Sequence, residues 1–548
     1  MSCPKPGGTA CVIGAGISGL TAIKHLLEYG ISVVCYEQSE NFGGLWRYND
    51  GDRQGYGAVM RNTILNTSKE FVAFSDFPMP AEEPNFMRND RFYCYIRDYA
   101  EHFDLLRHVQ FGTAVKEVRR APSYDEAGDW CVTTERAGDI KVTTFSYVMV
   151  CVGHHVQPHT PALKNIQLFR GQVSHSHDYK TFHDFVDRRV LVVGLGNSGG
   201  DVACELARVA KQVICSIRHG TWVARRVVQR GYPRDVLLRT RHYERMQNLL
   251  PASIRSRLSL MEFNTFLDHS LYGIRPIELP GQSPVLLADD LPLYLSSGFV
   301  KIRPDIARFT EGAVHYVDGN CDEVDNVIFC TGYDFKFDFI EDGTFIPSTD
   351  NQFELWRRIF PPLRKWNSLA VIGLIDPLGP TATACEMQSR AVAHIWAYGI
   401  NLPSDKEMLD EIRAEKTATA IRYRCSAKRA SLQTDFVSYM DQLATVVGCM
   451  PNLGWKFRLT DPQLAFWLHF GPVTPHHYRL HGRHAWPQAR EQILGTMDRV
   501  HRAMLPAQST FHPPPVWELL LTPHTRVIGW FTVAVLSLSI FLLITFLL

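Results

Sequence analysis

Two glycine-rich turns are the segments of this sequence best suited to chemistry. The first follows an apolar run at 9–13, precedes a helical pattern at 20–29, and reads Gly14-Ala15-Gly16-Ile17-Ser18-Gly19. In such a turn the first glycine allows a tight bend, the second lets backbone N–H groups approach a pyrophosphate, and the third lets the helix pack on the strand. A second apolar run, 31–36, ends at Glu37, whose carboxylate can accept hydrogen bonds from both hydroxyls of a ribose. The segment therefore predicts a dinucleotide site, and a second glycine pair at 43–44, before Leu45 and Trp46, predicts another close approach to the same nucleotide or a loop around a buried Trp.

The second turn has the same spacing but a different end. It lies between an apolar run at 189–193 and a helical pattern at 200–210, and it reads Gly194-Leu195-Gly196-Asn197-Ser198-Gly199. The next apolar run, 212–217, ends at Arg218 instead of an acid. A guanidinium suits the 2′-phosphate of NADPH, which Glu37 would repel. The alternative is that Arg218 and the arginines shortly after it form a solvated face.

Together the turns predict a flavoprotein that takes hydride from NADPH, with FAD on the first turn. Each fold closes with an apolar run that enters a small-residue turn, at 147–154 and at 327–333, so the second fold is inserted into the first. The expected class is α/β with two Rossmann-like dinucleotide-binding domains and a C-terminal transmembrane helix. The expected parts are an FAD domain at 1–155 and 335–450, an NADPH domain at 156–334 with a helical insertion at about 221–296, an extension at 451–520 and an anchor at 527–548.

Composition excludes several classes. The 548 residues carry a net charge of +1, without the cationic bias of a nucleic-acid-binding protein, so we expect no nucleic-acid partner. The 13 cysteines include no C-x-x-C pair and no Cys/His cluster at zinc spacing. This argues against a disulfide scaffold, a flavin disulfide reductase and a metal site. The oligomeric state stays open.

The C-terminus has the composition of a membrane anchor. Residues 527–548 contain no charged side chain, and 15 of these 22 residues are Val, Ile, Leu or Phe. A helix of this length reaches about 33 Å, against a hydrocarbon core of about 30 Å. Because the N-terminus has no signal-peptide pattern, we expect a tail anchor with the catalytic domains in the cytosol. The alternative is a buried core helix.

Further segments resemble the flavin-containing monooxygenases of animal microsomes. The fingerprint F-x-G-x-x-x-H, with an aromatic residue four positions on, is matched by Phe169, Gly171, His175 and Tyr179. The resemblance covers residues 9–505, and a hydrophobic C-terminal anchor is itself typical of the family. Other matching segments are 66–70, 76–78, 102–105, 231–233, 331–333, 470–472 and 478–480.

The resemblance implies a xenobiotic-metabolising oxidoreductase of the endoplasmic reticulum membrane. NADPH reduces FAD, O₂ adds at the flavin C4a, and the hydroperoxide transfers its distal oxygen to small lipophilic amines, thioethers or other soft nucleophiles. The protein excludes water and orients the cofactors, as is usual where the cofactor carries the chemistry.

The resemblance also assigns residues. Gly14 to Ser18, Glu37, Leu45, Trp46, Asn66 and Thr67 resemble flavin contacts, while Leu65, Asn66 and Ser198 to Asp201 (Ser198, Gly199, Gly200, Asp201) resemble NADP contacts. Asn66 is the catalytic candidate, because an amide can donate and accept hydrogen bonds without changing charge. The alternative is an Asn side chain that bonds its own loop.

Two segments depart from the family pattern. Asp376 stands where the family has Gln, and it either changes coupling and substrate preference or faces solvent. Arg225, Arg226, Arg230 and Arg234 form a basic stretch that either contacts the membrane surface or is a solvated face.

Two alternative functions remain open. A Baeyer–Villiger monooxygenase uses the same hydroperoxide to attack ketones, although Tyr179 favours the heteroatom enzymes. An uncoupled NADPH oxidase would release H₂O₂ instead, and the Asp376 segment is the feature in its favour.

Overall fold

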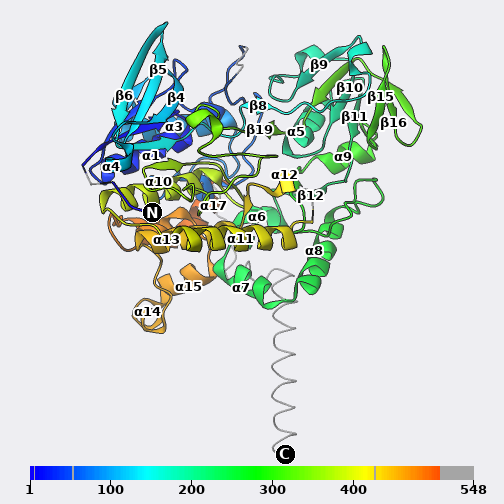
Figure 1. The fold of residues 1–548 in the computed structure, drawn as a ribbon. Coiled ribbons are helices and arrows are strands. Elements are labelled where there is room, and N and C mark those ends of the chain that lie inside the picture. The colour runs from blue at the N-terminus through cyan, green and yellow to red at the C-terminus, as the bar shows by residue number, and fades with distance from the viewer. Residues whose placement is uncertain (5–6, 52–54, 425–426, 506–548) are drawn as a thin grey trace, which may run out of the picture.

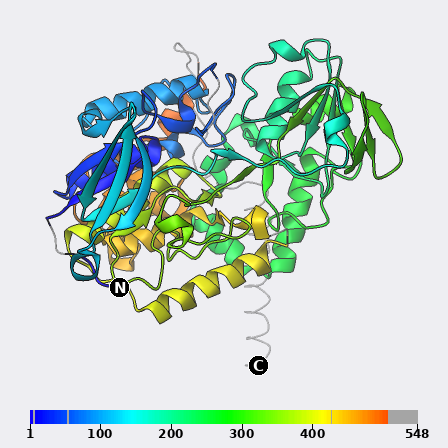
Figure 2. The same ribbon diagram turned by 45° about the horizontal axis from the view of Figure 1, so that its top comes forward.

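The structure is a computed structural model of the chain. It describes residues 1–4, 7–51, 55–424 and 427–505, and Figure 1 shows two lobes, each built on a parallel sheet. The turned view in Figure 2 shows the second sheet, in green, as a separate lobe beside the first, in blue.

The first lobe contains a five-stranded parallel sheet in the order β20-β7-β1-β2-β3. Its central strands are rich in Val, Ile and Tyr and buried on both faces, as is usual where helices cover both sides of a parallel sheet. Register is direct, with Thr9 opposite Ser32 and Ile13 opposite Tyr36. The strands are β1 (Thr9–Ile13), β2 (Ser32–Tyr36), β3 (Val109–Gln110), β7 (Tyr147–Val150) and β20 (Leu369–Val371).

The second lobe repeats this plan in the order β14-β11-β10-β18-β9, again all parallel. All five strands lie between β7 and β20 in the sequence, so the chain leaves the first sheet, builds the second and returns. The expected α/β class is thus confirmed. The strands are β9 (Gln172–His175), β10 (Arg189–Val193), β11 (Gln212–Ser216), β14 (Val300–Arg303) and β18 (Asn326–Phe329).

The chain passes between the lobes through a short antiparallel pair, β8 (Gln157–Pro158) with β19 (Tyr333–Asp334). Each lobe also carries a three-stranded antiparallel sheet. In the first lobe it contains β4 (Ala114–Arg120), β5 (Trp130–Arg136) and β6 (Asp139–Phe145), and in the second β15 (Ile306–Phe309), β16 (Ala313–Tyr316) and β17 (Cys321–Glu323).

Helices cover the sheets and connect the later segments to them. In the first lobe α10 (Thr381–Ala397) packs against both α1 (Ile17–Glu28) and α13 (Phe436–Val447). In the second lobe α5 (Asn197–Leu206) packs on the sheet and on α9 (Leu291–Ser296). Outside the segment 221–296, the other helices and the other strand pair are α2 (Lys69–Val72), α3 (Asn89–His102), α4 (Tyr124–Ala127), α11 (Asp405–Arg422), α12 (Ala427–Ala430), α14 (Trp455–Thr460), α15 (Pro462–Phe470), α16 (Ala489–Leu494), α17 (Thr496–Arg502), and β21 (Asp376–Pro377) with β22 (Gln433–Thr434).

The segment expected as a helical insertion contains both helices and strands. Its helices are α6 (Arg234–Leu238), α7 (Arg241–Leu249), α8 (Ala252–Phe266) and, at its end, α9. It also holds a parallel pair, β12 (Trp222–Ala224) with β13 (Val285–Leu287), which the sequence analysis missed. Trp222 of β12 is buried against Phe263 of α8, and Val285 and Leu287 of β13 pack against the same apolar cluster.

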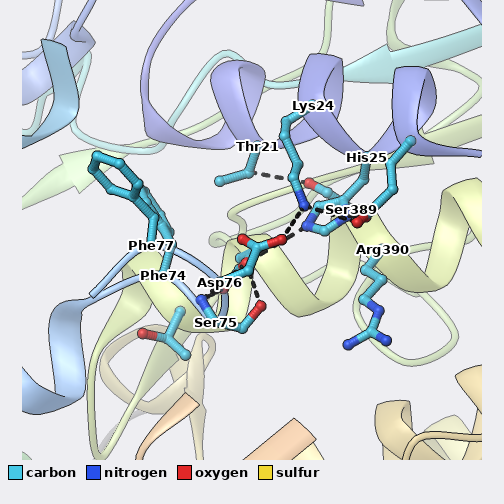
Figure 3. Close-up of polar contacts among 12 residues, drawn as sticks. Thr21, Lys24, His25, Phe74, Ser75, Asp76, Phe77, Ser389 and Arg390 are labelled. Carbon is cyan, nitrogen blue, oxygen red and sulfur yellow. Dashed lines mark hydrogen bonds and ion pairs between the residues drawn. The ribbon is translucent and has the colours of Figure 1, made fainter. Parts of the chain in front are cut away.

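A buried ionic cluster joins α1, α10 and the loop at 75–76, as Figure 3 shows. Lys24 Nζ lies 2.6 Å from Asp76 Oδ2, and Glu386 accepts hydrogen bonds from the Ser75 hydroxyl and N–H at 2.6 and 2.9 Å. Arg479 reaches the same cluster from the C-terminal segment. Charged groups are tolerated here because each has an oppositely charged or hydrogen-bonding partner.

The expected anchor at 527–548 lies outside the residues that the structure describes. Within the described ranges, no helix combines the length and apolar character needed to cross a bilayer.

Candidate functional site

The first glycine-rich turn joins β1 to α1 and leaves no room for side chains at its ends. Gly14 has a φ of +99°, and a Cβ on it would lie 2.7 Å from the Cys151 carbonyl oxygen. A Cβ on Gly19 would lie 1.8 Å from the Gly14 carbonyl oxygen. The bend is therefore available only to glycine, and it directs the N-terminus of α1 toward the carboxyl edge of the sheet.

Gly16 differs, because the protein itself does not require a glycine there. A Cβ on Gly16 would lie 3.6 Å from Gly44 Cα, an ordinary contact distance. A glycine at this position is what the motif predicts where a ligand approaches the backbone closely. Gly43 donates its N–H to the Ala15 carbonyl at 2.9 Å, so the segment that carries Leu45 and Trp46 packs on the first turn.

Glu37 braces this turn from the end of β2. One carboxylate oxygen accepts the Ala15 N–H at 2.7 Å and the other accepts the Ser39 N–H at 2.8 Å. A carboxylate offers about four acceptor positions, so Glu37 keeps capacity for ribose hydroxyls.

The second turn reproduces the first in detail. Gly194 has a φ of +96°, and its Cβ would again lie 2.7 Å from a carbonyl oxygen, that of Cys330. A Cβ on Gly199 would lie 2.1 Å from the Gly194 carbonyl oxygen, while nothing lies within 4 Å of a Cβ on Gly196. Gly200 is also constrained, because a Cβ would lie 2.5 Å from Leu286 Cδ1. Both turns therefore fit a dinucleotide pyrophosphate.

The predicted nucleotide residues around the second turn differ in exposure. Ser198, in the first turn of α5, and Arg218, two residues beyond β11, are exposed. Asp201, further along α5, is half-buried, and burial raises its pKa to about 6. Its Oδ1 lies 3.5 Å from Arg226 Nη2.

Asn66 lies in a loop of the first lobe that the insertion holds. Its Oδ1 accepts hydrogen bonds from Arg226 Nε at 3.1 Å and Nη2 at 2.8 Å. The preceding Leu65 is buried and donates its N–H to the Met87 carbonyl at 2.9 Å. Thr67, half-buried, follows Asn66 in this loop. The side chain of Asn66 thus bonds another segment rather than its own loop.

This arrangement corrects the interpretation of the basic stretch. Arg226 points inward to Asn66 and Asp289, and Arg234 pairs with Glu262 of α8 at 3.1 Å. The Arg225 guanidinium lies 4.5 Å from the Phe266 ring centroid. The stretch is therefore neither a purely solvated face nor a free cationic surface. Sequence spacing alone could not show which of its arginines turn inward.

The fingerprint segment lies at the junction of the lobes. Tyr179 donates its hydroxyl to Glu205 at 2.6 Å, and the other carboxylate oxygen of Glu205 accepts from Asn62 at 2.6 Å. His175 is buried in β9, and burial lowers its pKa to about 4, so its ring is neutral at pH 7. The fingerprint therefore connects the second lobe to the loop that precedes Asn66.

Asp376 is the first residue of β21, and the loop between β20 and β21 lies close to the first turn. In this loop a Cβ on Gly373 would lie 2.3 Å from Ser18 Oγ, and the Gly373 carbonyl lies 3.0 Å from His154 Nδ1. Solvent reaches Asp376, yet protein atoms surround it, and this desolvation raises its pKa to about 6. Gln433 donates a hydrogen bond to its Oδ2. Gly373 rather than Asp376 approaches Ser18, and Asp376 itself is exposed and bonded to Gln433, so a role in coupling stays a prediction.

Comparison with known proteins agrees with this geometry. The chain is 41% identical to flavin-containing monooxygenase 5 of Rattus norvegicus over 498 residues, which cover 90% of this chain and 92% of the relative. S-allyl-L-cysteine S-oxygenase from Allium sativum shares the fold, with a TM-score of 0.61 at 22% identity over 89% of this chain and 98% of that one.

A cyclohexanone monooxygenase mutant from Rhodococcus sp. Phi1, bound to NADP⁺, also shares the fold, with a TM-score of 0.59 at 18% identity over 80% of this chain and 97% of that one. The family model described as "FMO-like: Flavin-binding monooxygenase-like" matches residues 8–545. The resemblance inferred from the motifs is thereby confirmed, and the chain belongs to the flavin-binding monooxygenase-like family.

Proposed function

We propose that this enzyme uses NADPH and O₂ to oxygenate small molecules at soft nucleophilic nitrogen or sulfur atoms. FAD and NADPH are the cofactors of the family. The first turn, with Glu37, is proposed to hold FAD, and the second turn, with Arg218, to hold NADPH. The observation that carries the proposal is that Arg226 links Asn66 of the first lobe to Asp201 of the second turn's helix.

When bound, NADPH supplies a hydride and reduced FAD activates O₂. The residues of the chain bind and orient these groups. The N-termini of α1 and α5 favour the pyrophosphates, and the His175 ring at the junction is neutral at pH 7, because burial lowers its pKa to about 4. Asn66 can donate through Nδ2 while its Oδ1 is occupied by Arg226, so it can stabilise a negatively charged oxygen without releasing a proton.

The variant Asn66→Ala tests this role. It should retain FAD, because the first turn and Glu37 are untouched, but a larger share of the NADPH consumed should appear as H₂O₂ instead of oxygenated product. The measurement compares NADPH oxidation, H₂O₂ and product in one reaction. Full coupling in the variant would show that Asn66 does not act on oxygen.

Ketone oxygenation is the second candidate, and the shared fold with a cyclohexanone monooxygenase supports it. Incubation with a thioether, a tertiary amine and a cyclic ketone separates the functions by product, as sulfoxide, N-oxide or lactone. H₂O₂ at the full NADPH rate with all three would instead favour an oxidase.

We also propose that residues 527–548 anchor the chain in the endoplasmic reticulum membrane, where lipophilic substrates collect. The two lobes then lie in the cytosol. The uncharged sequence of this segment supports the proposal. Alkaline extraction of membranes that contain the full chain or residues 1–520 tests it. Release of both forms would contradict anchoring by this segment.

A further inference from the structure

Residues 226–235 of the insertion form a small closed loop. Arg234 donates its N–H to the Arg226 carbonyl at 2.8 Å, and Val228 donates to the Tyr232 carbonyl at 2.9 Å. Tyr232 is buried, and its hydroxyl lies 2.8 Å from His501 Nε2 of the C-terminal segment. These contacts anchor the loop independently of any ligand. The loop contains the 231–233 segment, to which the proposed function assigns no role.

Both ends of this loop hold the segment that carries Asn66. At one end the Arg226 guanidinium donates two hydrogen bonds to Asn66 Oδ1. At the other end the Asp235 carboxylate accepts the Ser68 N–H at 2.6 Å. Because a guanidinium only donates, the amide must present its oxygen to Arg226. Both hydrogens on Nδ2 are then left for a partner other than Arg226.

Arg226 is itself held in one orientation. Asp289 accepts its backbone N–H at 3.0 Å and its Nη1 at 3.3 Å, and Asp201 lies 3.5 Å from Nη2. The Arg226 side chain is only 11% exposed. A planar donor fixed by two carboxylates defines the plane and direction of the amide that accepts from it.

We infer that Arg226 is a positioning residue, which orients the Asn66 amide so that its NH₂ group serves the oxygen-transfer step. The inference rests on the proposed role of Asn66. In this arrangement the insertion controls how much of the consumed O₂ reaches product. Arg226 contacts no reacting atom and acts through Asn66.

The test is a double-mutant cycle in the full-length holoenzyme, with Arg226→Gln, Asn66→Ala and the two combined. The H₂O₂ formed per product should rise about tenfold in Arg226→Gln, as expected when a hydrogen bond to a charged group is lost. Adding Arg226→Gln to Asn66→Ala should have no further effect, because the two residues act in series. Arg226→Lys should retain part of the coupling, since a lysine ammonium can donate a hydrogen bond to Asn66 Oδ1. It cannot donate the two parallel hydrogen bonds that the guanidinium makes.

Two measurements separate positioning from structural damage or nucleotide binding. FAD content is read from the flavin absorbance, and the dissociation constants of NADP⁺ and NAD⁺ are read from the flavin fluorescence. The FAD content and the two dissociation constants should stay near wild type in Arg226→Gln and in the control variant Arg225→Gln. The coupling of NADPH oxidation to product should be unchanged only in the control. If Arg226→Gln loses FAD, the coupling is instead measured in Arg226→Lys and in Asp289→Asn, each alone and combined with Asn66→Ala.

Three outcomes would overturn the inference. One is an effect of Arg226→Gln that adds in full to that of Asn66→Ala. Another is a loss of affinity for NADP⁺ but not for NAD⁺, which would make Arg226 a phosphate ligand. The third is full coupling in Arg226→Gln while Asn66→Ala is uncoupled. Full coupling in Asn66→Ala itself would instead refute the role proposed for Asn66, on which the inference rests.

Discussion

The guanidinium of Arg479, in the C-terminal segment, lies 2.7 Å from the carboxylate of Asp76, a residue of the first lobe about 400 positions earlier. Arg479 also contacts Glu28 of α1 at 3.0 Å, and its side chain is only 1% exposed. The cluster in Figure 3 therefore depends on a charge from the far end of the chain. Removal of this charge would leave Lys24 to serve both the Asp76 and the Glu28 carboxylates.

We expect Arg479→Met to lower the free energy of unfolding by about 3–5 kcal/mol, the usual cost of removing one partner of a buried ion pair. Arg502→Met is the matched control, because Arg502 is exposed and its loss should change stability by less than about 0.5 kcal/mol. Denaturant unfolding of both variants measures the difference. Equal stabilities would show that the cluster contributes little.

The same cluster predicts a dependence of stability on pH. Burial alone would raise the pKa of Asp76, but Arg479 and then Lys24 outweigh it, so the pKa lies below its ordinary value. A lowered carboxyl pKa stabilises the fold above the pKa of the unfolded chain, about 4, and this contribution is lost as the pH falls further. Asp76→Asn should thus be less stable than wild type at pH 7, with a difference that narrows below about pH 4. A constant difference across urea titrations from pH 7 to pH 3 would contradict the linkage.

The glycines of the first turn should respond differently to alanine. Gly19→Ala should prevent stable folding of the lobe, because its Cβ would lie 1.8 Å from the Gly14 carbonyl oxygen. Gly16→Ala should fold, since its Cβ would meet only Gly44 Cα at 3.6 Å, but should weaken FAD binding about tenfold or more, corresponding to roughly 1.4 kcal/mol. Circular dichroism and FAD titration measure the two properties. Wild-type FAD affinity in Gly16→Ala would place the cofactor elsewhere.

Arg218→Ala tests the nucleotide preference of the second turn. Arg218 is exposed after β11, where a 2′-phosphate is expected. Loss of a charged hydrogen bond should raise the KM for NADPH about 10- to 100-fold and leave the KM for NADH nearly unchanged. Steady-state kinetics with both nucleotides provide the measurement. Equal changes for the two would exclude the phosphate contact.

Asp376 should give activity a pH dependence near pH 6. Desolvation by the surrounding protein atoms raises its pKa to about 6, so the carboxyl group is mostly neutral below this value and mostly charged above it. A raised carboxyl pKa also means that folding stability from this group falls as the pH rises through about 6. Asp376→Asn should remove the step near pH 6 from both the kcat/KM profile and the stability profile. Unchanged profiles in the variant would assign the step to another group.

Much of the fold follows from local sequence. The apolar runs at 9–13 and 189–193 are the strands β1 and β10, because each can be buried on both faces of a parallel sheet. Both helices after the glycine turns begin inside the turn, at Ile17 and Asn197, because the last glycine of each motif packs as a helical residue. Each helix thus begins three residues earlier than expected, at 17 instead of 20 and at 197 instead of 200.

The sequence by itself determined the two glycine-rich turns and the charge of the residue that follows the next strand, since both are local properties. Only the tertiary structure decided the surroundings of Asn66. Arg226 lies 160 residues away and was grouped with exposed arginines, because neither propensity nor spacing records which side chains meet across the lobes. The same reason hid the contact of Arg479 with Asp76. Such pairs form only when the two lobes have folded and packed together. A buried charge is then stable because the fold places an oppositely charged or hydrogen-bonding group next to it.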